Sequence, residues 1–402
     1  MLKDFLQIAR IIKNAIRTYY RQKKSPVLSF QEAQRKTELK KMEDPKRVDI
    51  YNSVTLTEEQ LSQIDTLFTN HYGCKVPYIW HRHYTAFTGT FDAFYFPELL
   101  YIPEFEFYMN QDEDVLNVLE DKNFATNLFR TTNIRTTKNI VSCTCGVFRD
   151  ARNQLITKDI ALSILSDAGR VFLKPTRNTS SGKGCFIADF QGGKDTLSQK
   201  DCSDVLDGMG NDFAVQEIIV CHDSIRAIYG ESVNTFRIIT YIWNNEICFM
   251  PAIMRIGQGG SHVDNAHAGG MFIAVNSDGT LHKTAFTEFK TTYTQHPDTG
   301  VIFEGYRISN FEKALCAAKE LHSLIPQVGV VNWDFTIDQD GEPVFIEANT
   351  RYGSIWLIQM THGIGPFGKR TPEVLDWLRF MNQLSPQERK NYRYGKMPDS
   401  FA

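Results

Sequence analysis

The stretch Val330–Arg351, VVNWDFTIDQDGEPVFIEANTR, most constrains what this chain can fold into. Two runs that alternate apolar and polar residues flank an Asp-Gly turn, which is typical of a β-hairpin. If the hairpin closes symmetrically about that dipeptide, Asp334 lies opposite Glu347. Asn332 then lies opposite Asn349, and all four side chains share one face because side chains alternate along a strand.

The two faces of this hairpin predict different surroundings. Carboxylates directly opposite each other repel, and a divalent cation with oxygen ligands reverses that interaction. The alternative is an ordinary solvated hairpin face. A clean apolar back face favours buried strands and a metal site at Asp334, Glu347 and Asn349, because buried carboxylates need partners. That back face consists of Val331, Trp333, Phe335 and Ile337 against Val344, Ile346 and Ala348.

Composition excludes several classes of protein. The 402 residues are 42% hydrophobic and 23% charged, as in a soluble globular protein large enough for two or more domains. The net charge of −3 argues against a general nucleic-acid-binding surface. No apolar run is long enough to span a membrane, and the N-terminus lacks a signal-peptide pattern. Eight scattered cysteines suit free thiols in a reducing compartment, so we expect a cytoplasmic location.

The N-terminus is locally basic. Residues 1–41 carry eleven Lys/Arg against three Asp/Glu, and residues 1–24 place apolar side chains at helical spacing. Such a helix can lie on an anionic membrane surface, here the inner face of the membrane. A helix that packs on its own domain or on a second subunit explains the pattern as well. A dense aromatic run, Tyr78–Tyr108, follows, and it favours packing over base stacking because few Lys or Arg interleave with it.

Two segments in the middle of the chain could bind a nucleotide. Lys174 ends a predicted strand and precedes the loop TRNTSSGKGC, whose backbone N–H groups and lysine could bind phosphate. The loop is not a Walker A motif, and an ordinary flexible loop is the alternative. The predicted strand ending in Gln216–Ile219 could present its backbone to an adenine edge, with Asp223 near ribose hydroxyls.

Three arginines, Arg237, Arg255 and Arg351, lie near polar strand ends. A guanidinium group there could hold a carboxylate or the charge that develops on a transferred phosphoryl group. Most arginines are surface residues, so the alternative for each of the three is an exposed side chain with no role in the site.

The order of these features resembles the ATP-grasp superfamily from Asp121 to the mid-360s. The sequence is most similar to the sugar-transfer-associated ATP-grasp group found with bacterial cell-surface polysaccharide genes. The stretches that carry the resemblance are YIPEFEFYMNQDEDVLNVLEDKNF, VFLKPTRNTSSGKGCFIADF, SVNTFRIIT, MRIGQGGSHVDNAHAGGMF and VNWDFTIDQDGEPVFIEANTR.

The resemblance implies an α/β (α+β) ATP-grasp fold, in which two α/β lobes grip ATP after a helical N-terminal extension. We therefore expect a basic helical extension over 1–50, an aromatic-rich region over 51–120 and the ATP-grasp domain over 121–370. Within that domain, the small lobe covers about 139–220 and the large lobe about 221–370. A closing helix and tail occupy 371–402. No clear βαβ substrate lobe precedes Lys122, which leaves the acceptor site unassigned.

The resemblance also implies site roles. Lys122 and Lys174 would contact the nucleotide phosphates, and Gln216 to Ile219 would read adenine. Asp334, Glu347 and Asn349 would hold Mg²⁺, while Arg255, Arg351 and Arg237 would steady the transferred phosphoryl group. The remaining predicted nucleotide contacts are Ser180, Ser181, Gly182, Lys183 and Gly184 in the phosphate loop, Glu217 and Ile218 in the hinge, and Asp223 near the ribose.

The implied chemistry is ATP- and Mg²⁺-dependent ligation of a carboxylate to an amine through an acyl phosphate, on small-molecule or sugar-linked substrates. Positioning and charge neutralisation supply the catalysis, and no protein nucleophile is needed. A phosphotransferase that uses the same ATP site is the first alternative. A non-catalytic nucleotide-binding scaffold at the membrane is the second.

Overall fold

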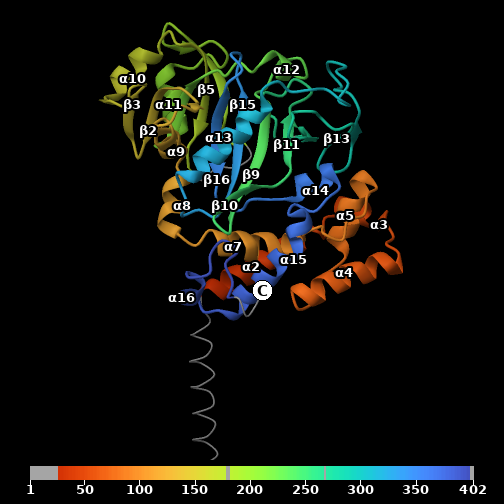
Figure 1. The fold of residues 1–402 in the computed structure, drawn as a ribbon. Helices are drawn as coiled ribbons and strands as arrows, with labels where there is room; N and C mark the ends of the chain where they lie inside the picture. Colours follow the sequence, from red (N-terminus) through yellow and green to blue (C-terminus); the bar gives the residue numbers. More distant parts are fainter. Residues whose placement is uncertain (1–25, 178–181, 267–268, 399–402) are drawn as a thin grey trace, which may run out of the picture.

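The structure is a computed structural model that describes residues 26–177, 182–266 and 269–398. Figure 1 shows two β-sheets above a base of helices. The α/β architecture agrees with the fold class expected from the sequence. The predicted basic helix over 1–24, and with it the predicted membrane contact, lies outside the described residues, as do Ser180 and Ser181.

The larger sheet has nine strands in the order β1-β16-β15-β9-β11-β12-β13-β14, and β10 pairs with β9 off this path. Its central strands are rich in β-branched and aromatic residues, and every residue of β15 is buried. The helix α13 (Phe311–Ser323) packs on this sheet. The strands are β1 (Arg135–Thr136), β9 (Thr235–Trp243), β10 (Glu246–Phe249), β11 (Ala252–Ile256), β12 (Met271–Val275), β13 (Ala285–Phe286), β14 (Thr292–Tyr293), β15 (Val330–Ile337) and β16 (Pro343–Asn349).

The predicted hairpin is the pair β15–β16. Asp334 pairs with Glu347 and Asn332 with Asn349, which confirms the predicted register at the open end. A β-bulge then shifts the register, so that Phe335 pairs with Phe345. The prediction that Ile346 belongs to the apolar back face was therefore wrong. The bulge places it on the wall of a cavity.

The smaller sheet has seven antiparallel strands in the order β4-β3-β2-β8-β5-β6-β7. The helices α10 (Lys158–Leu165) and α11 (Cys202–Met209) contribute Leu165 and Leu206 to its separate apolar core. The strands are β2 (Asn139–Thr144), β3 (Val147–Asp150), β4 (Leu155–Ile156), β5 (Gly169–Pro175), β6 (Phe186–Gln191), β7 (Lys194–Asp195) and β8 (Phe213–Glu217).

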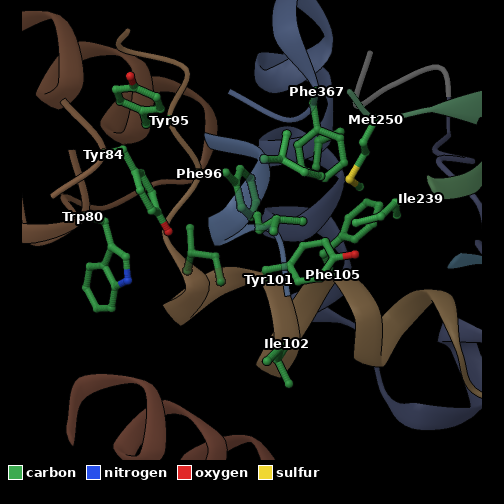
Figure 2. Close-up of a cluster of buried hydrophobic side chains, with 14 of the residues drawn as sticks. Trp80, Tyr84, Tyr95, Phe96, Tyr101, Ile102, Phe105, Ile239, Met250 and Phe367 are labelled. Carbon is green, nitrogen blue, oxygen red and sulfur yellow. The ribbon is translucent and has the colours of Figure 1, made fainter. Parts of the chain in front are cut away.

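The aromatic run forms the core of the helical base, as predicted. Tyr84, Tyr95, Tyr101 and Phe105 are buried together with Phe367 from the far end of the chain (Figure 2). The helices of this base are α2 (Pro26–Lys41), α3 (Pro45–Asn52), α4 (Glu58–His71), α5 (Ile79–Thr88), α6 (Glu98–Leu100), the π-helix η1 (Tyr101–Glu106), α7 (Phe107–Met109), α14 (Trp356–His362), α15 (Thr371–Gln383) and α16 (Pro386–Arg389).

The sequence between the helical base and the smaller sheet forms two helices. The helical stretch is not continuous, because α8 (Glu113–Leu119) ends before Asp121 and α9 (Lys122–Phe129) begins after it. The Asp121 carboxylate accepts the N–H groups of Asn123 and Phe124, which is N-capping and starts a new helix. This break places Lys122 at a helix N-terminus. In the part of the chain that the structure describes, no helix is long and apolar enough to cross a membrane.

Candidate active site

A cavity of about 810 Å³ lies between the two sheets. Ile346, Glu347, Ala348 and Asn349 of β16 line it, as do the ends of β5 and β8 from the smaller sheet. Most of the predicted site residues meet there. They are Lys122, Lys174, Gly182, Gln216, Glu217, Ile218, Ile219, Arg237, Arg255, Asp334, Glu347, Asn349 and Arg351.

Two lysines mark one end of this cavity. Lys122 Nζ lies 3.2 Å from Glu347 Oε1. Lys174, at the end of β5, is only 6% exposed. Burial and the neighbouring Lys122 lower the pKa of Lys174 to about 8, and Glu347 opposes them only in part. Two cations share one carboxylate here, so the cluster has an excess of positive charge that an anion would neutralise.

Apolar side chains mark another part of the wall. Phe172, Ile187 and the bulged Ile346 line the cavity near the strand end Glu217–Val220. The Gln216 side chain donates to Thr137 Oγ1 and Asn139 Oδ1, so its amide ties neighbouring strands together. An apolar slot beside exposed strand-end backbone fits a planar base.

Some predicted nucleotide contacts lie away from the cavity. Lys183 and Gly184 do not line it. The Asp223 side chain is 92% exposed, lies near Arg226 and does not line the cavity either. Glu231, which follows α12 (Asp223–Arg226), does line it.

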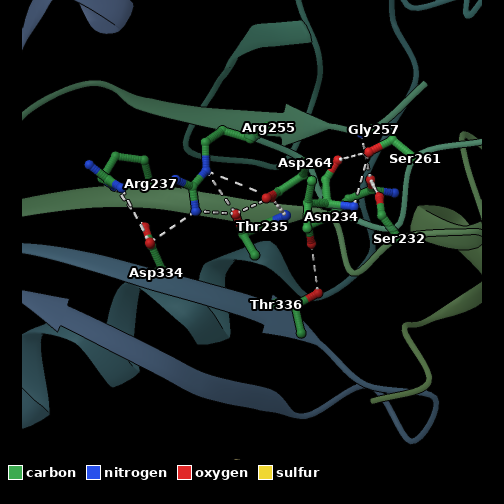
Figure 3. Close-up of polar contacts among 11 residues, drawn as sticks. Ser232, Asn234, Thr235, Arg237, Arg255, Gly257, Ser261, Asp264, Asp334 and Thr336 are labelled. Atoms are coloured by element: carbon green, nitrogen blue, oxygen red, sulfur yellow. Dashed lines mark hydrogen bonds and ion pairs between the residues drawn. The ribbon is translucent and has the colours of Figure 1, made fainter. Parts of the chain in front are cut away.

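Two arginines and two aspartates form a largely buried cluster on β9, β11, β15 and the loop between β11 and β12 (Figure 3). Arg237 Nε donates to Asp334 Oδ1 at 2.7 Å, and Arg255 Nη2 lies 2.9 Å from Asp334 Oδ2. Arg255 also donates to Thr235 Oγ1, and its Nε lies 3.7 Å from Asp264 Oδ2. The cluster is close to neutral, which makes its burial tolerable.

The acidic and basic side chains of this cluster stabilise each other's charged forms. Burial works to raise the pKa of Asp334, but the guanidinium groups of Arg237 and Arg255 outweigh it and lower that pKa. Burial works to lower the pKa of Arg255, and Asp334 with Asp264 raises it on balance. Arg255 therefore stays charged at the cavity wall.

Arg351 lies at the rim. Its guanidinium group donates to Glu120 Oε1 at 2.8 Å and to Asn117 Oδ1 at 3.0 Å, and it also pairs with Glu113. These contacts tie the end of the hairpin to α8 and to the residue after it. To reach a phosphoryl group, Arg351 would have to leave these carboxylates.

The oxygen ligands at the hairpin fit a magnesium ion that arrives with a triphosphate. Mg²⁺ takes one or two protein carboxylates and completes its shell with phosphate oxygens and water. Glu347 and the Asn349 amide oxygen provide such a set. Asp334 differs from the expectation, because both of its oxygens already accept hydrogen bonds from guanidinium groups. Within the described ranges, no group of three or more His, Cys, Asp or Glu residues could hold a metal ion by itself.

Sequence reasoning missed a part of the cavity wall. Residues 352–354, together with Trp356 and Leu357, line it beyond the hairpin. In the sequence, only the aromatic residues Tyr352 and Trp356 shortly after Arg351 could have indicated this part of the wall. Asp264 was noticed as part of the family pattern, but its contact with Arg255 could not be read from the sequence.

The fold and the site together define an ATP-grasp protein: two sheets close on one cavity that holds paired lysines, a Glu-x-Asn strand end and two arginines. The family described as sugar-transfer associated ATP-grasp matches residues 103–372. The chain belongs to this family. No curated protein matches the sequence.

Solved structures with a similar arrangement include three synthetases or ligases. An N5-carboxyaminoimidazole ribonucleotide synthetase in its ADP complex is 14% identical, with a TM-score of 0.36 over 60% of this chain and 47% of that one. D-alanyl-alanine synthetase A from Vibrio cholerae is 13% identical, with a TM-score of 0.35 over 68% and 63%. An L-amino acid ligase from Bacillus licheniformis is 12% identical, with a TM-score of 0.32 over 59% and 42%. The chain spans about half the length of the first of these proteins, and family membership rests on the family match alone.

Proposed function

We propose that the protein is an ATP- and Mg²⁺-dependent, ADP-forming carboxylate–amine ligase that works through an acyl phosphate. One observation supports this most: Lys122 and Lys174 converge on Glu347 in the cavity that Arg237 and Arg255 also line. Paired lysines suit the phosphates of ATP. Charged arginines at the same wall suit the carboxylate that attacks and the charge that develops during transfer.

Each residue has a definite task in this proposal. Lys122 and Lys174 bind the phosphates, and the slot of Phe172, Ile187 and Ile346 takes the base. Glu347 and Asn349 would hold Mg²⁺, which neutralises phosphate charge and orients the terminal phosphate. Arg255 would contact the phosphoryl group as it moves from ATP to the substrate carboxylate. Asp334 keeps Arg237 and Arg255 in place, and Glu231 is better placed than Asp223 to meet the ribose.

We further propose that the two substrates are a sugar-linked or amino-acid carboxylate and an amine, and that the reaction belongs to bacterial surface polysaccharide synthesis. The description of the family as sugar-transfer associated supports this setting. The test is ADP release from MgATP with pooled uronic acids and amino acids, with hydroxylamine as a trap. Hydroxamate is the expected product. ADP release that requires an alcohol and gives no hydroxamate would replace the ligase with a kinase.

Glu347→Gln tests the metal position. We expect Mg²⁺-dependent ADP release to fall by at least roughly a hundredfold, because the change removes the one carboxylate charge of the proposed ligand pair Glu347 and Asn349. The free energy of unfolding should stay within about 1 kcal/mol, since the side chain is partly exposed. Glu342→Gln is the matched control, because Glu342 pairs with Lys313 at the turn of the same hairpin, away from the cavity. Equal activity in both variants would refute the assignment.

A further inference from the structure

A second cavity, of about 380 Å³, lies beside the nucleotide cavity. Thr350, Arg351 and Tyr352 line both cavities, so these three residues form a shared wall. One end of a molecule bound in the smaller cavity would therefore lie beside Thr350, the residue after the proposed Mg²⁺ ligand Asn349. The proposed function leaves this cavity without a role.

The far walls of the smaller cavity are apolar and aromatic. Ile102 and Leu116 line it, together with Phe30 of α2 and Phe107 of α7. The rings of Phe30 and Phe107 stack with their centroids 5.5 Å apart. A cavity of this size and lining fits a small molecule with an apolar or aromatic body.

One buried carboxyl group sets the chemistry of this cavity, because the other two charged residues that line it, Arg351 and Glu113, pair with each other. Glu106 is 5% exposed and lines the cavity. Its Oε1 and Oε2 accept the backbone N–H groups of Tyr352 and Gly353, each at 2.6 Å. No Lys, Arg or His among the described residues forms an ion pair with it, and burial raises the pKa of Glu106 to about 8 against those two N–H groups. Each oxygen keeps a second lone pair for a further donor.

The shared wall has two further features of a binding site. Thr350 is buried, and its Oγ1 has no hydrogen-bond partner within the described part of the chain. Tyr352 has a left-handed backbone, with φ of 54°, which is costly for a residue with a side chain. Glu106 holds this strained residue by its N–H group. An unpaired hydroxyl and a fixed strained residue beside a cavity are typical of ligand contacts.

We infer that the smaller cavity is the subsite for the amine substrate, an amine with an apolar or aromatic body whose ammonium group pairs with Glu106. The inference rests on the proposed function and deepens it. Below about pH 8 the Glu106 carboxyl is largely protonated in the free protein, and a bound ammonium group supplies the countercharge that no described residue gives it and so favours its ionised form. Thr350, Arg351 and Tyr352 line both cavities, so the amine lies next to the acyl phosphate of the larger cavity.

The chemistry balances in this arrangement. Glu106 takes one proton from the ammonium group, and its raised pKa suits that step. The free amine attacks the acyl carbon, so the C–N bond forms and the C–O bond to phosphate breaks. The second proton leaves with the phosphate.

The test uses phenethylamine as the probe and 3-phenylpropionate as the matched acid, titrated into the full-length chain and followed by ligand-observed NMR. We expect the amine to bind and the acid to bind at least roughly tenfold more weakly, because only the amine pairs with Glu106. Equal binding of both probes, or no binding of the amine at millimolar concentration, overturns the inference.

Two variants and a control locate the binding. Leu116→Trp fills the cavity and Glu106→Gln removes its charge, so each should weaken phenethylamine binding at least roughly tenfold. Val118→Trp on the exposed face of the same helix should leave binding unchanged. Unchanged binding in Glu106→Gln overturns the inference even if Leu116→Trp does not fold. Phenethylamine binding without hydroxamate from any carboxylate pool overturns the ligase proposal, and with it the role of this cavity as an amine subsite.

Discussion

Lys174 shows how strongly one residue depends on its surroundings. It is a lysine at the end of a buried strand, beside a second lysine, and both effects favour its neutral form. The sequence identified it by the strand and the glycine-rich loop that follows. The lowered pKa could not be predicted, because Lys122 and Glu347 approach it only in the folded chain.

This pKa predicts that ATP binding takes up protons. Below pH 8 Lys174 is an ammonium group ready for phosphate, and above pH 8 the free protein has lost that charge. Bound phosphate raises the pKa again, so binding near pH 8 draws a fraction of a proton from solution and weakens as the pH rises. Calorimetry in buffers of different ionisation enthalpy measures the uptake. Lys174→Arg should abolish it, since arginine stays charged, and persistent uptake in that variant would contradict the assignment.

Asp334 is a second case at this scale. Its position opposite Glu347 followed from side-chain alternation alone, and the structure agrees. Its partners could not be predicted, because Arg237 and Arg255 come from strands about 80 to 100 residues earlier in the chain. Charge pairing across a sheet depends on strand order, and nothing local in a sequence encodes strand order.

At the scale of elements, the hairpin is fixed to the helical base by one side chain. Asn110 follows α7, and its Nδ2 donates to the carbonyl groups of Val330 and Thr350. Its Oδ1 accepts the N–H groups of Gly329 and Val330. All of these atoms are buried. Asn110 thus satisfies backbone groups at the open end of both strands that carry the site.

Asn110→Ala should lower the free energy of unfolding by about 3 kcal/mol, because four buried backbone groups lose their partner. Urea unfolding followed by tryptophan fluorescence measures the change. Asn211→Ala, on an exposed turn residue, is the control and should stay within about 0.5 kcal/mol of the parent. A similar loss in both variants would show that Asn110 does not hold the hairpin.

The elements also show where sequence patterns stop being sufficient. The Thr57–Gln60 capping box and the Asn244–Asn245 hairpin turn depend on local sequence alone, and both form. The bulge at Ile346 was not predicted, since an extra residue in one strand leaves no mark on an alternating pattern. It moves Ile346 from the expected core to the wall of the larger cavity.

At the scale of the molecule, one apolar core joins the helical base to the larger sheet. Buried residues of this core run from Met42 to Met381, and they include Tyr241 of β9 and Val330 of β15. Sequence reasoning divided the chain at 121 and 370, where composition and family resemblance change. Packing does not follow that division, because the aromatic run 78–108 covers the sheet.

A fragment of residues 121–370 should therefore fail to fold alone. It would expose the side of β9 and α14 that Tyr101, Phe105 and Trp377 cover in the whole chain. We expect aggregation on size-exclusion chromatography and no cooperative urea transition, while the full chain shows one. A monomeric fragment that unfolds cooperatively and binds ATP would show that the predicted division is also a physical one.

The contacts of α4 with α15 and of α5 with α14 also affect how the protein is made. A ribosome releases the N-terminal helices first. The helices α4 and α5 therefore leave it long before α15 and α14, which cover one face of each, have been synthesised. Until then their apolar faces stay in contact with water, and such surface is what holding chaperones bind. The nascent chain should thus need a chaperone on its first helices until its last ones emerge.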